Sequence, residues 1–562
     1  MKKIFMIAVV VILSLTGCSD FLETKSLTEK NTSNFPANEG DMYSSLIAAY
    51  SNQIALGQAQ TSQDFFVISE ILSDDRLGGG ESDRALQGLN AFKKYTEDQF
   101  LAAWKNYYSG IFRANFLIES IDNIQWKNKA DRDKILGRAY FIRAYYYFDL
   151  CRLFERVPLR LKTGTENIPQ ATPEELYGQM ASDLKNAIEL LPAIAYQTMS
   201  KSELGLATKW SAEALMGRMF MFYTGFYKKN EIALPEGGSV SKENTIAWLE
   251  DCINNSGHGL ISEYRNLWSY AYCKYYGYTT TNNLKWIGET GDNIEAVYLR
   301  KYSALGNAGV AASYDNNVSL FLSHGKQHQV PFGYGNGIGT VNPKLWSDWP
   351  DNDIRKKGTV YYAYDPEEKA GSSGYKYTAQ AYQETGYWSK KNTPINVYKN
   401  GVVTPKTTAN MVNMSVELYG RAASYQQDNS VDLMIIRFSD VLLMASELGS
   451  ANAQTYFDRV RARVGLLTLP VTLDNLKAER RWEFATEAIR YWDLMRWGDV
   501  ETVINQNMKD IPIIQVGTNK NLTITFRPET RGFLWIPQSE INLSYGVLTQ
   551  NPGWGPESLF TE

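Results

Sequence analysis

Residues 137–154 read GRAYFIRAYYYFDLCRLF and form the middle of a predicted helix, 131–156, that ends before Val157-Pro158. The sequence predicts further helices around it, over 41–55, 98–123, 173–191, 209–227 and 244–252. In the helix that follows Thr172, a suitable N-cap, apolar residues recur at steps of three and four, as in an amphipathic helix. Helices of this length with short connections predict stacked helical hairpins, although no sequence unit repeats clearly at a 34-residue period.

The composition and the helical patterning of the sequence change after residue 256. Residues 257–430 are rich in Gly, Asn, Thr, Tyr and Trp, and helices are predicted again only over 439–448, 451–464 and 473–497. Dense aromatics argue against disorder, and loops on a rigid support often carry binding residues. We therefore expect a mainly α fold of TPR-like helical hairpins with a large loop-rich second layer and few short strands. Its parts are an N-terminal helical scaffold (39–256), a loop-rich ligand-binding region (257–430) and C-terminal helices with a closing segment (431–562).

The first residues predict export and lipid attachment. Two lysines precede an apolar stretch over 4–15, which is shorter than the roughly 20 residues that span a bilayer and has the size of a signal-peptide core. Leu15-Thr-Gly-Cys18 resembles the lipobox of bacterial lipoproteins, in which the cysteine becomes the lipidated first residue. We expect a signal peptide over 1–17, lipid on Cys18 and a polar tether over 18–38; the alternative is a secreted protein with a chance cysteine.

Composition excludes several classes of function. The net charge of −4 and a pI near 5.8 give no electrostatic case for binding nucleic acid, which requires a basic face. Three histidines give no basis for a His-based metal site, and the chain has neither Cys-x-x-Cys nor Gly-x-Ser-x-Gly. We expect no cofactor. Cys151 is predicted to be buried, whereas Cys252 and Cys273 could pair in an oxidising compartment or remain free.

Five blocks of sequence carry a resemblance to a known family. They are WKNYYSGIFRAN (104–115), GRAYFIRAYYYFDL (137–150), RFSDVLLMASE (437–447), VRARVGL (460–466) with the charged helix after it, and WIPQSEIN (535–542) followed by QNPGW (550–554). In these blocks and their order, the chain resembles the SusD/RagB family of outer-membrane lipoproteins. Members of that family bind nutrients, usually glycans, beside a TonB-dependent transporter of the SusC type.

The resemblance implies a SusD-like fold, attachment to the outer membrane facing the cell exterior, a SusC-type partner and no enzyme activity. The middle of the chain matches poorly, so the resemblance does not name the ligand. Within the charged block, Glu483 and Glu487 are one helical turn apart and are expected to pair along the helix with Arg480 and Arg490. The alternative role for two such carboxylates is acid/base catalysis of glycoside hydrolysis.

A first candidate binding region is the segment around Ser73-Asp-Asp-Arg76. A similar Ser-Asp-Asp segment leads into a loop near the ligand in the SusD/RagB family, which implies ligand contact by Asp74, Asp75 and Arg76 and, beyond Gly78-Gly-Gly80, by Arg84. Carboxylates accept and guanidinium groups donate hydrogen bonds to sugar hydroxyls, and glycines let a loop approach closely. The alternative is a helix C-terminal turn capped by glycine.

A second candidate region is the aromatic middle of the chain. Exposed Trp and Tyr rings can stack on the apolar faces of sugars, and we expect two or three of these aromatics to form such a platform. The candidates are Trp268, Tyr275, Tyr276, Trp286, Tyr314 and Tyr334, with Trp286 and Tyr276 as the preferred pair. For any one of these side chains, packing in a core is the alternative.

Together these patterns predict a cell-surface protein that binds a polysaccharide or oligosaccharide and delivers it to a SusC-type transporter. The alternatives are a lipid-anchored glycan hydrolase or esterase, a binder of peptides or glycopeptides, and a scaffold without a small ligand. Cleavage of an oligosaccharide would favour the enzyme, and the absence of exposed clustered aromatics would favour the scaffold.

Overall fold

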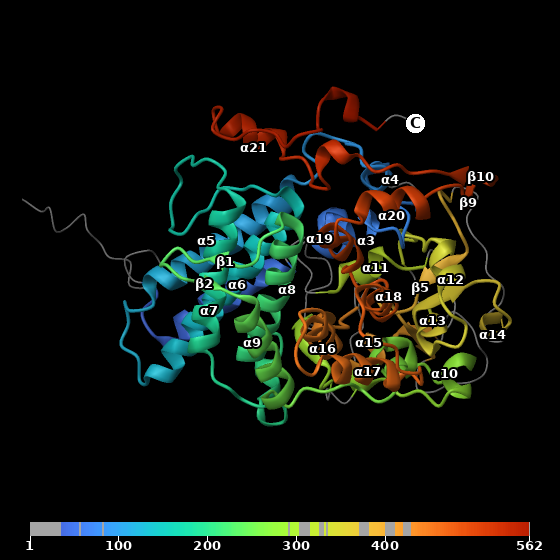
Figure 1. The fold of residues 1–562 in the computed structure, drawn as a ribbon, viewed down its shortest axis with the longest axis horizontal. Helices are drawn as coiled ribbons and strands as arrows, with labels where there is room; N and C mark the ends of the chain where they lie inside the picture. Colours follow the sequence, from blue (N-terminus) through green and yellow to red (C-terminus); the bar gives the residue numbers. More distant parts are fainter. Residues whose placement is uncertain are drawn as a thin grey trace, which may run out of the picture.

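The computed structural model describes residues 35–54, 58–80, 84–289, 293–302, 315–324, 331–332, 335–369, 381–398, 411–419 and 429–560. Long helices on one side of the molecule give way on the other side to short helices and two-stranded sheets (Figure 1). The mainly α fold with a loop-rich second layer is thus confirmed. Cys18 and the tether up to residue 34 lie outside the described residues. Within the described part, no helix is both long enough and apolar enough to cross a membrane.

The N-terminal scaffold consists of long helices that pack against their neighbours along the chain. They are α2 (Glu39–Tyr50), α5 (Leu101–Ser120), α6 (Lys129–Phe154), α7 (Pro173–Leu190), α8 (Lys209–Tyr227) and α9 (Lys242–Asn255). Helix α7 begins with a capping box, in which the Thr172 hydroxyl accepts from the Glu175 N–H and the Glu175 carboxylate accepts from the Thr172 N–H. Thr172 is therefore the N-cap that the sequence predicted.

Helix α6 lies at the centre of this scaffold. Apart from Tyr140, residues 137–154 are all buried, and α5 and α7 pack against the helix. Arg143 crosses to both neighbours: it binds the Asp183 carboxylate through two hydrogen bonds of 2.7 Å and donates to Asn115 at 2.9 Å. A buried guanidinium requires such partners, so this one residue ties three helices together.

The C-terminal helices close the same core. They are α16 (Phe438–Glu447), α17 (Ala453–Arg463), α18 (Leu473–Phe484), α19 (Arg490–Trp497), α20 (Val500–Asn507) and α21 (Gln538–Leu543). Helices α16 and α19 pack on α8, and α3 (Phe65–Leu72) packs on α19 and on α4 (Arg84–Asn90). One hydrophobic cluster therefore runs from Met42 to Trp554.

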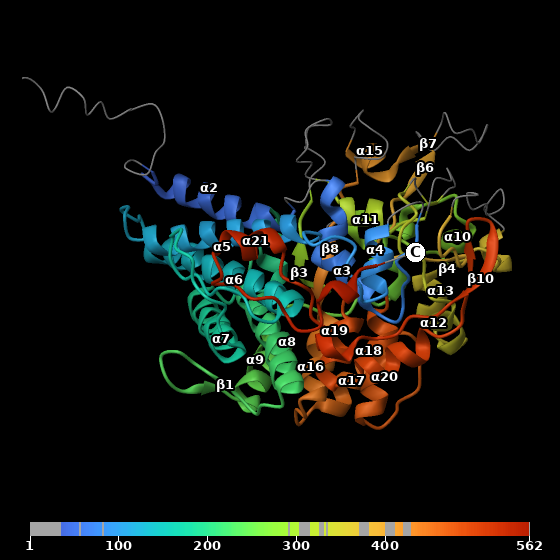
Figure 2. The ribbon, with the colours of Figure 1, turned by 90° about the horizontal axis from the view of Figure 1, so that it is seen from above.

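The loop-rich layer holds short elements with a hydrophobic cluster of their own. Its helices are α10 (Gly277–Thr281), α11 (Asn317–Phe321), α12 (Pro343–Asp348), α13 (Ile354–Thr359), α14 (Pro366–Lys369) and α15 (Met414–Tyr419). Antiparallel strand pairs are β3 (Ala296–Arg300) with β8 (Leu433–Arg437), β4 (Val360–Tyr362) with β5 (Tyr387–Ser389), and β6 (Asn396–Tyr398) with β7 (Met411–Asn413). Because β3 and β8 pair, the layer begins and ends at one place against the helices (Figure 2).

Two hairpins complete the strand content of the described chain. They are β1 (Ile232–Ala233) with β2 (Ser239–Val240), beside α7, and β9 (Ile511–Gln515) with β10 (Thr518–Leu522). Although β9 and β10 belong to the C-terminal part of the sequence, they lie beside the loop-rich layer near α12 (Figure 1).

The single helix predicted over 473–497 is wrong, because the chain breaks between α18 and α19. At the break, Thr486 and Ala488 adopt positive φ angles of 63° and 61°, which non-glycine residues rarely do. The Ala488 N–H donates to the Glu70 carboxylate at 2.7 Å, and Glu487 binds Lys391 and Arg437. Buried ionic contacts to distant segments therefore override the local helical pattern.

Those contacts belong to a buried network of ion pairs between the loop-rich layer and α18. Arg437 at the end of β8 reaches Glu295, Glu483 and Glu487 at 2.6–2.7 Å. Arg355 on α13 reaches Glu483 at 3.0 Å. The expectation that Glu483 and Glu487 pair along an exposed helix face is thus wrong, since both side chains are at most 4% exposed and their partners come from other segments.

Candidate functional site

Asp74 is fully buried where α3 meets the C-terminal helices. Its carboxylate accepts hydrogen bonds from Arg490 at 2.8 Å and from Asn507 at 2.7 Å. Burial alone would raise the pKa of Asp74, but Arg490 and Arg481 outweigh it and lower that pKa below its usual range. Asp74 is thus a charged group that joins α3 to α19 and α20.

Asp75 and Arg76 are also buried and paired. Asp75 accepts from Arg481 at 2.8 Å, and Arg76 donates to Glu70 at 2.5 Å and to the Gly339 carbonyl at 2.6 Å. These contacts give each side chain a structural role and leave it no exposed surface. Ligand contact by Asp74, Asp75 and Arg76 stays a prediction.

Two predicted side chains keep part of their surface. Arg84 on α4 is partly exposed, with its guanidinium 5.7 Å from the centre of the Tyr382 ring. Tyr275 is partly exposed and meets Tyr398 edge to face, with ring centroids 5.1 Å apart. Tyr314 and Tyr334 lie outside the described residues.

The other predicted aromatics are packed in the core of the loop-rich layer. Trp268, Tyr276 and Trp286 are only 3%, 2% and 8% exposed. Tyr276 donates to Glu368, and Trp286 meets Tyr272 edge to face at 6.3 Å. In this arrangement the preferred pair, Trp286 and Tyr276, offers no open ring face, so packing accounts for both, and their contact with a ligand also stays a prediction.

Two buried lysines lie over aromatic rings of this core. The Lys390 ammonium lies 4.0 Å from the centre of the Tyr278 ring, and Lys391 lies 4.9 Å from that of Trp268. Lys390 pairs with Glu368, and Lys391 with Glu487 at 2.6 Å. Burial lowers the pKa of Lys391 to about 8. The ring faces therefore stabilise cations of the protein itself.

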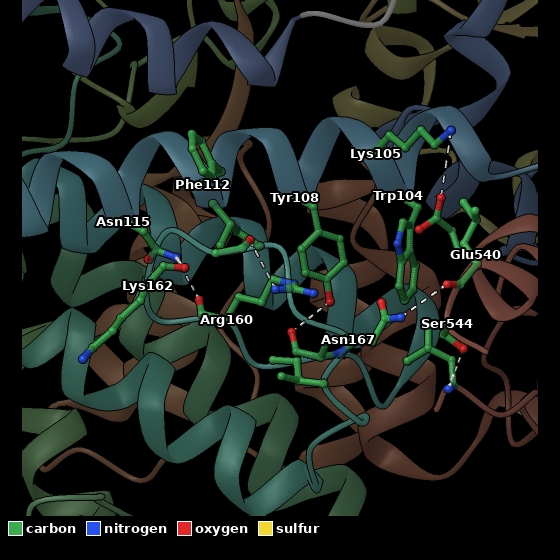
Figure 3. A pocket seen from close by; sticks show the side chains of 16 residues that line it. Trp104, Lys105, Tyr108, Phe112, Asn115, Arg160, Lys162, Asn167, Glu540 and Ser544 are labelled. Carbon is green, nitrogen blue, oxygen red and sulfur yellow. Dashed lines mark hydrogen bonds and ion pairs between the residues drawn. The ribbon is translucent and has the colours of Figure 1, made fainter. Parts of the chain in front are cut away.

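One hollow of about 320 Å³ lies between α5, the segment 158–168 and α21 (Figure 3). Its polar groups mostly serve the chain itself: Tyr108 donates to the Pro158 carbonyl at 2.9 Å, Asn115 to the Arg160 carbonyl at 3.0 Å and Asn167 to the Leu543 carbonyl at 3.3 Å. The charged side chains of the lining are Lys105, Arg160, Lys162 and Glu540, of which Lys105 and Glu540 pair with each other at 4.0 Å.

A second hollow, of about 610 Å³, is a groove between the β4–β5 pair and the β9–β10 hairpin. The residues that line it are Pro343, Tyr364, Glu384, Thr385, Gly386, Tyr387, Pro512, Ile513, Ile514, Asn519, Lys520 and Asn521. None of these was predicted from the sequence. The alternation of Tyr362 and Tyr364 in the sequence could have indicated an aromatic face. The groove itself was not predictable, because its two walls come from segments more than 120 residues apart.

The described part of the chain contains no group of three or more His, Cys, Asp or Glu side chains that could hold a metal ion. Cys151, Cys252 and Cys273 are buried free thiols, and burial raises the pKa of Cys273 to about 12. Arginines hold the pKa of Glu483 well below its usual range despite burial, which is the opposite of what a general acid needs.

Comparisons with known proteins agree on the family. The sequence model of the SusD family matches residues 269–554, and a model described as "Starch-binding associating with outer membrane" matches residues 20–221. The SusD-like protein P25 of Formosa agariphila is 21% identical over 531 residues, which is 88% of this chain and 90% of that protein.

Solved structures agree on the fold. A laminarin binding SusD-like protein aligns with a TM-score of 0.71 at 24% identity, covering 92% of this chain and 100% of that one. Surface glycan-binding protein A from Bacteroides thetaiotaomicron, in complex with laminarihexaose, aligns with a TM-score of 0.69 at 22% identity, covering 91% and 98% of the two chains. With a family model over half of its length and this fold throughout, the chain belongs to the SusD family.

Proposed function

We propose that this protein binds a polysaccharide or oligosaccharide at the surface of a bacterial outer membrane and delivers it to a SusC-type TonB-dependent transporter. The observation that carries the proposal is its membership of the SusD family, supported by the starch-binding family description over residues 20–221. Two proteins with this fold are named as a laminarin binding protein and as a complex with laminarihexaose.

The proposed anchor is lipid on Cys18, followed by the tether over 18–38. Replacing Cys18 by Ala removes the only group that could be alkylated there, so the variant should move from the membrane fraction to the soluble fraction. Retention of the variant in the membrane would refute lipid attachment at this residue. We also propose that the chain divides into its parts after residues 38, 256 and 430.

The proposed activity is binding without turnover. Glu483 and Glu487, the carboxylates that could have served hydrolysis, are held by arginines and a lysine in the core. Of the predicted contact residues that the structure describes, Arg84 and Tyr275 keep part of their surface exposed. Tyr314 and Tyr334, which lie outside the described residues, stay predictions.

The test is calorimetric titration of the full-length protein, extracted in detergent, with laminarin, starch, other neutral polysaccharides and a peptide mixture. The same samples are analysed for cleavage products. We expect binding of a glycan with no cleavage. Hydrolysis would establish an enzyme, and binding of peptides alone would replace the glycan. Failure to copurify with a TonB-dependent transporter from native membranes would remove the delivery role.

A further inference from the structure

The groove between the β4–β5 pair and the β9–β10 hairpin has an aromatic wall. Tyr364, which is 47% exposed, and Tyr387, which is partly exposed, line it. Tyr387 stacks on Tyr362, its cross-strand partner, with ring centroids 4.3 Å apart and planes at 5°, and Trp346 packs against both rings. A ring supported in this way is held in place, so a ligand that contacts it costs little side-chain entropy.

The opposite wall is polar. Asn519 and Asn521 occupy alternate positions of β10, so their side chains share one face of the hairpin. Both are exposed, and within the described chain neither side chain has a hydrogen-bond or ionic partner. Each amide can both donate and accept, as a sugar hydroxyl does.

Backbone contacts hold the two walls at a set separation. Glu384 and Ile514 exchange backbone hydrogen bonds of 3.0 and 2.8 Å, which tie the hairpin to the segment before β5. The Thr385 hydroxyl donates to the Val341 carbonyl at 2.9 Å. Gly386, with φ at 77°, lets the Tyr364 ring lie close, since a Cβ here would be 3.1 Å from that ring. The groove is thus formed before any ligand arrives.

The charge of the lining selects among ligands. Lys520 is the lining cation, and the Glu384 carboxylate accepts from the Gly386 N–H at 2.7 Å. With one cation and one carboxylate that already accepts a hydrogen bond, the lining gives no basis for binding a polyanion. A polyanion would be favoured by a cluster of arginines. A volume of about 610 Å³ falls within the range of small-molecule sites.

We propose that this groove is a binding site for a neutral oligosaccharide, with Tyr364 and Tyr387 stacking on sugar faces and Asn519 and Asn521 binding hydroxyls. The inference rests on the proposed function and names a contact surface for it. The elements that border the groove, β5, β9 and β10, lie at the end of the molecule opposite to α5–α7 (Figure 1), and Figure 2 shows α12 and β10 at that same end.

The test titrates the full-length protein and three variants with the neutral polysaccharide that the wild type binds. Laminarin is the first polysaccharide to be tried. Tyr364→Ala removes the exposed ring, and the double variant Asn519→Ala/Asn521→Ala removes the two amides. Tyr545→Ala, at a 90% exposed tyrosine beside α21, is the matched control. We expect each groove variant to weaken binding about tenfold or more, with unchanged thermal unfolding, and the control to bind as the wild type.

The possible outcomes separate the site from the function. Wild-type binding that both groove variants retain would overturn the groove as the site and leave glycan binding intact. Binding of no saccharide by the wild type would overturn the proposed function and this inference together. Loss of peptide binding, rather than saccharide binding, in the groove variants would overturn the ligand class.

Discussion

Replacing Glu483 by Gln removes one negative charge from a fully buried cluster of guanidinium groups while keeping the shape of the side chain. Arg437 and Arg355 contact the Glu483 carboxylate at 2.7 and 3.0 Å, and Arg463 also pairs with it. All four side chains are at most 2% exposed. Since the volume is unchanged, the effect of Glu483→Gln reports charge rather than packing.

The expected loss is about 3–5 kcal/mol of unfolding free energy at pH 7, because removing one partner leaves buried charge without compensation. Urea unfolding, followed by near-UV and far-UV circular dichroism, measures it. Glu501→Gln, at an exposed position on α20, is the control and should change stability by less than about 0.5 kcal/mol. An unfolding midpoint for Glu483→Gln equal to that of the control would refute the stabilising role of the network.

The pH dependence gives an independent check. Burial alone would raise the pKa of Glu483, but Arg463, Arg437 and Arg355 hold it well below its ordinary value of 4.5. The charged group therefore stabilises the fold above pH 4.5, and this contribution is lost as the pH falls through the lower pKa of the folded state. The difference between wild type and Glu483→Gln should accordingly shrink below pH 4.5. A constant difference down to pH 3 would contradict this.

Three further outcomes follow from buried groups. Trp286→Ala should cost about 3–5 kcal/mol in urea unfolding, as expected for a buried Trp; a variant of full stability that has lost glycan binding would restore Trp286 as a ligand residue. Burial lowers the pKa of His258 to about 4, so stability should fall by up to about 3 kcal/mol from pH 6.5 to 4, and His258→Gln should flatten that fall; an unaltered slope would contradict it. Burial and then Asp251 raise the pKa of Glu213 to about 9, so the stability that protonated Glu213 contributes to the fold is lost as the pH rises from 4.5 towards 9. Because Gln stays neutral, Glu213→Gln should unfold at a higher temperature than wild type at pH 8, and a lower temperature would refute this.

Helix positions were predicted well where the information is local. The helix predicted over 209–227 is α8, and Thr172 caps α7 as expected. Caps and apolar stripes depend on residues three or four positions apart, which the sequence displays directly. The family resemblance came from the same kind of segment, because blocks such as 137–150 are buried helix and their residues pack the shared scaffold.

Residue roles that depend on distant partners were not predictable in the same way. Local patterns were enough to predict the helical scaffold and the family. Three findings came from tertiary packing alone: Glu483 is a buried group bound by Arg355 and Arg437, Trp268 faces a lysine, and a groove forms between 384–387 and 512–521. The physical reason is that helical periodicity arises within one turn, whereas the burial and partners of a charge or a ring are set by segments that meet only when the chain folds.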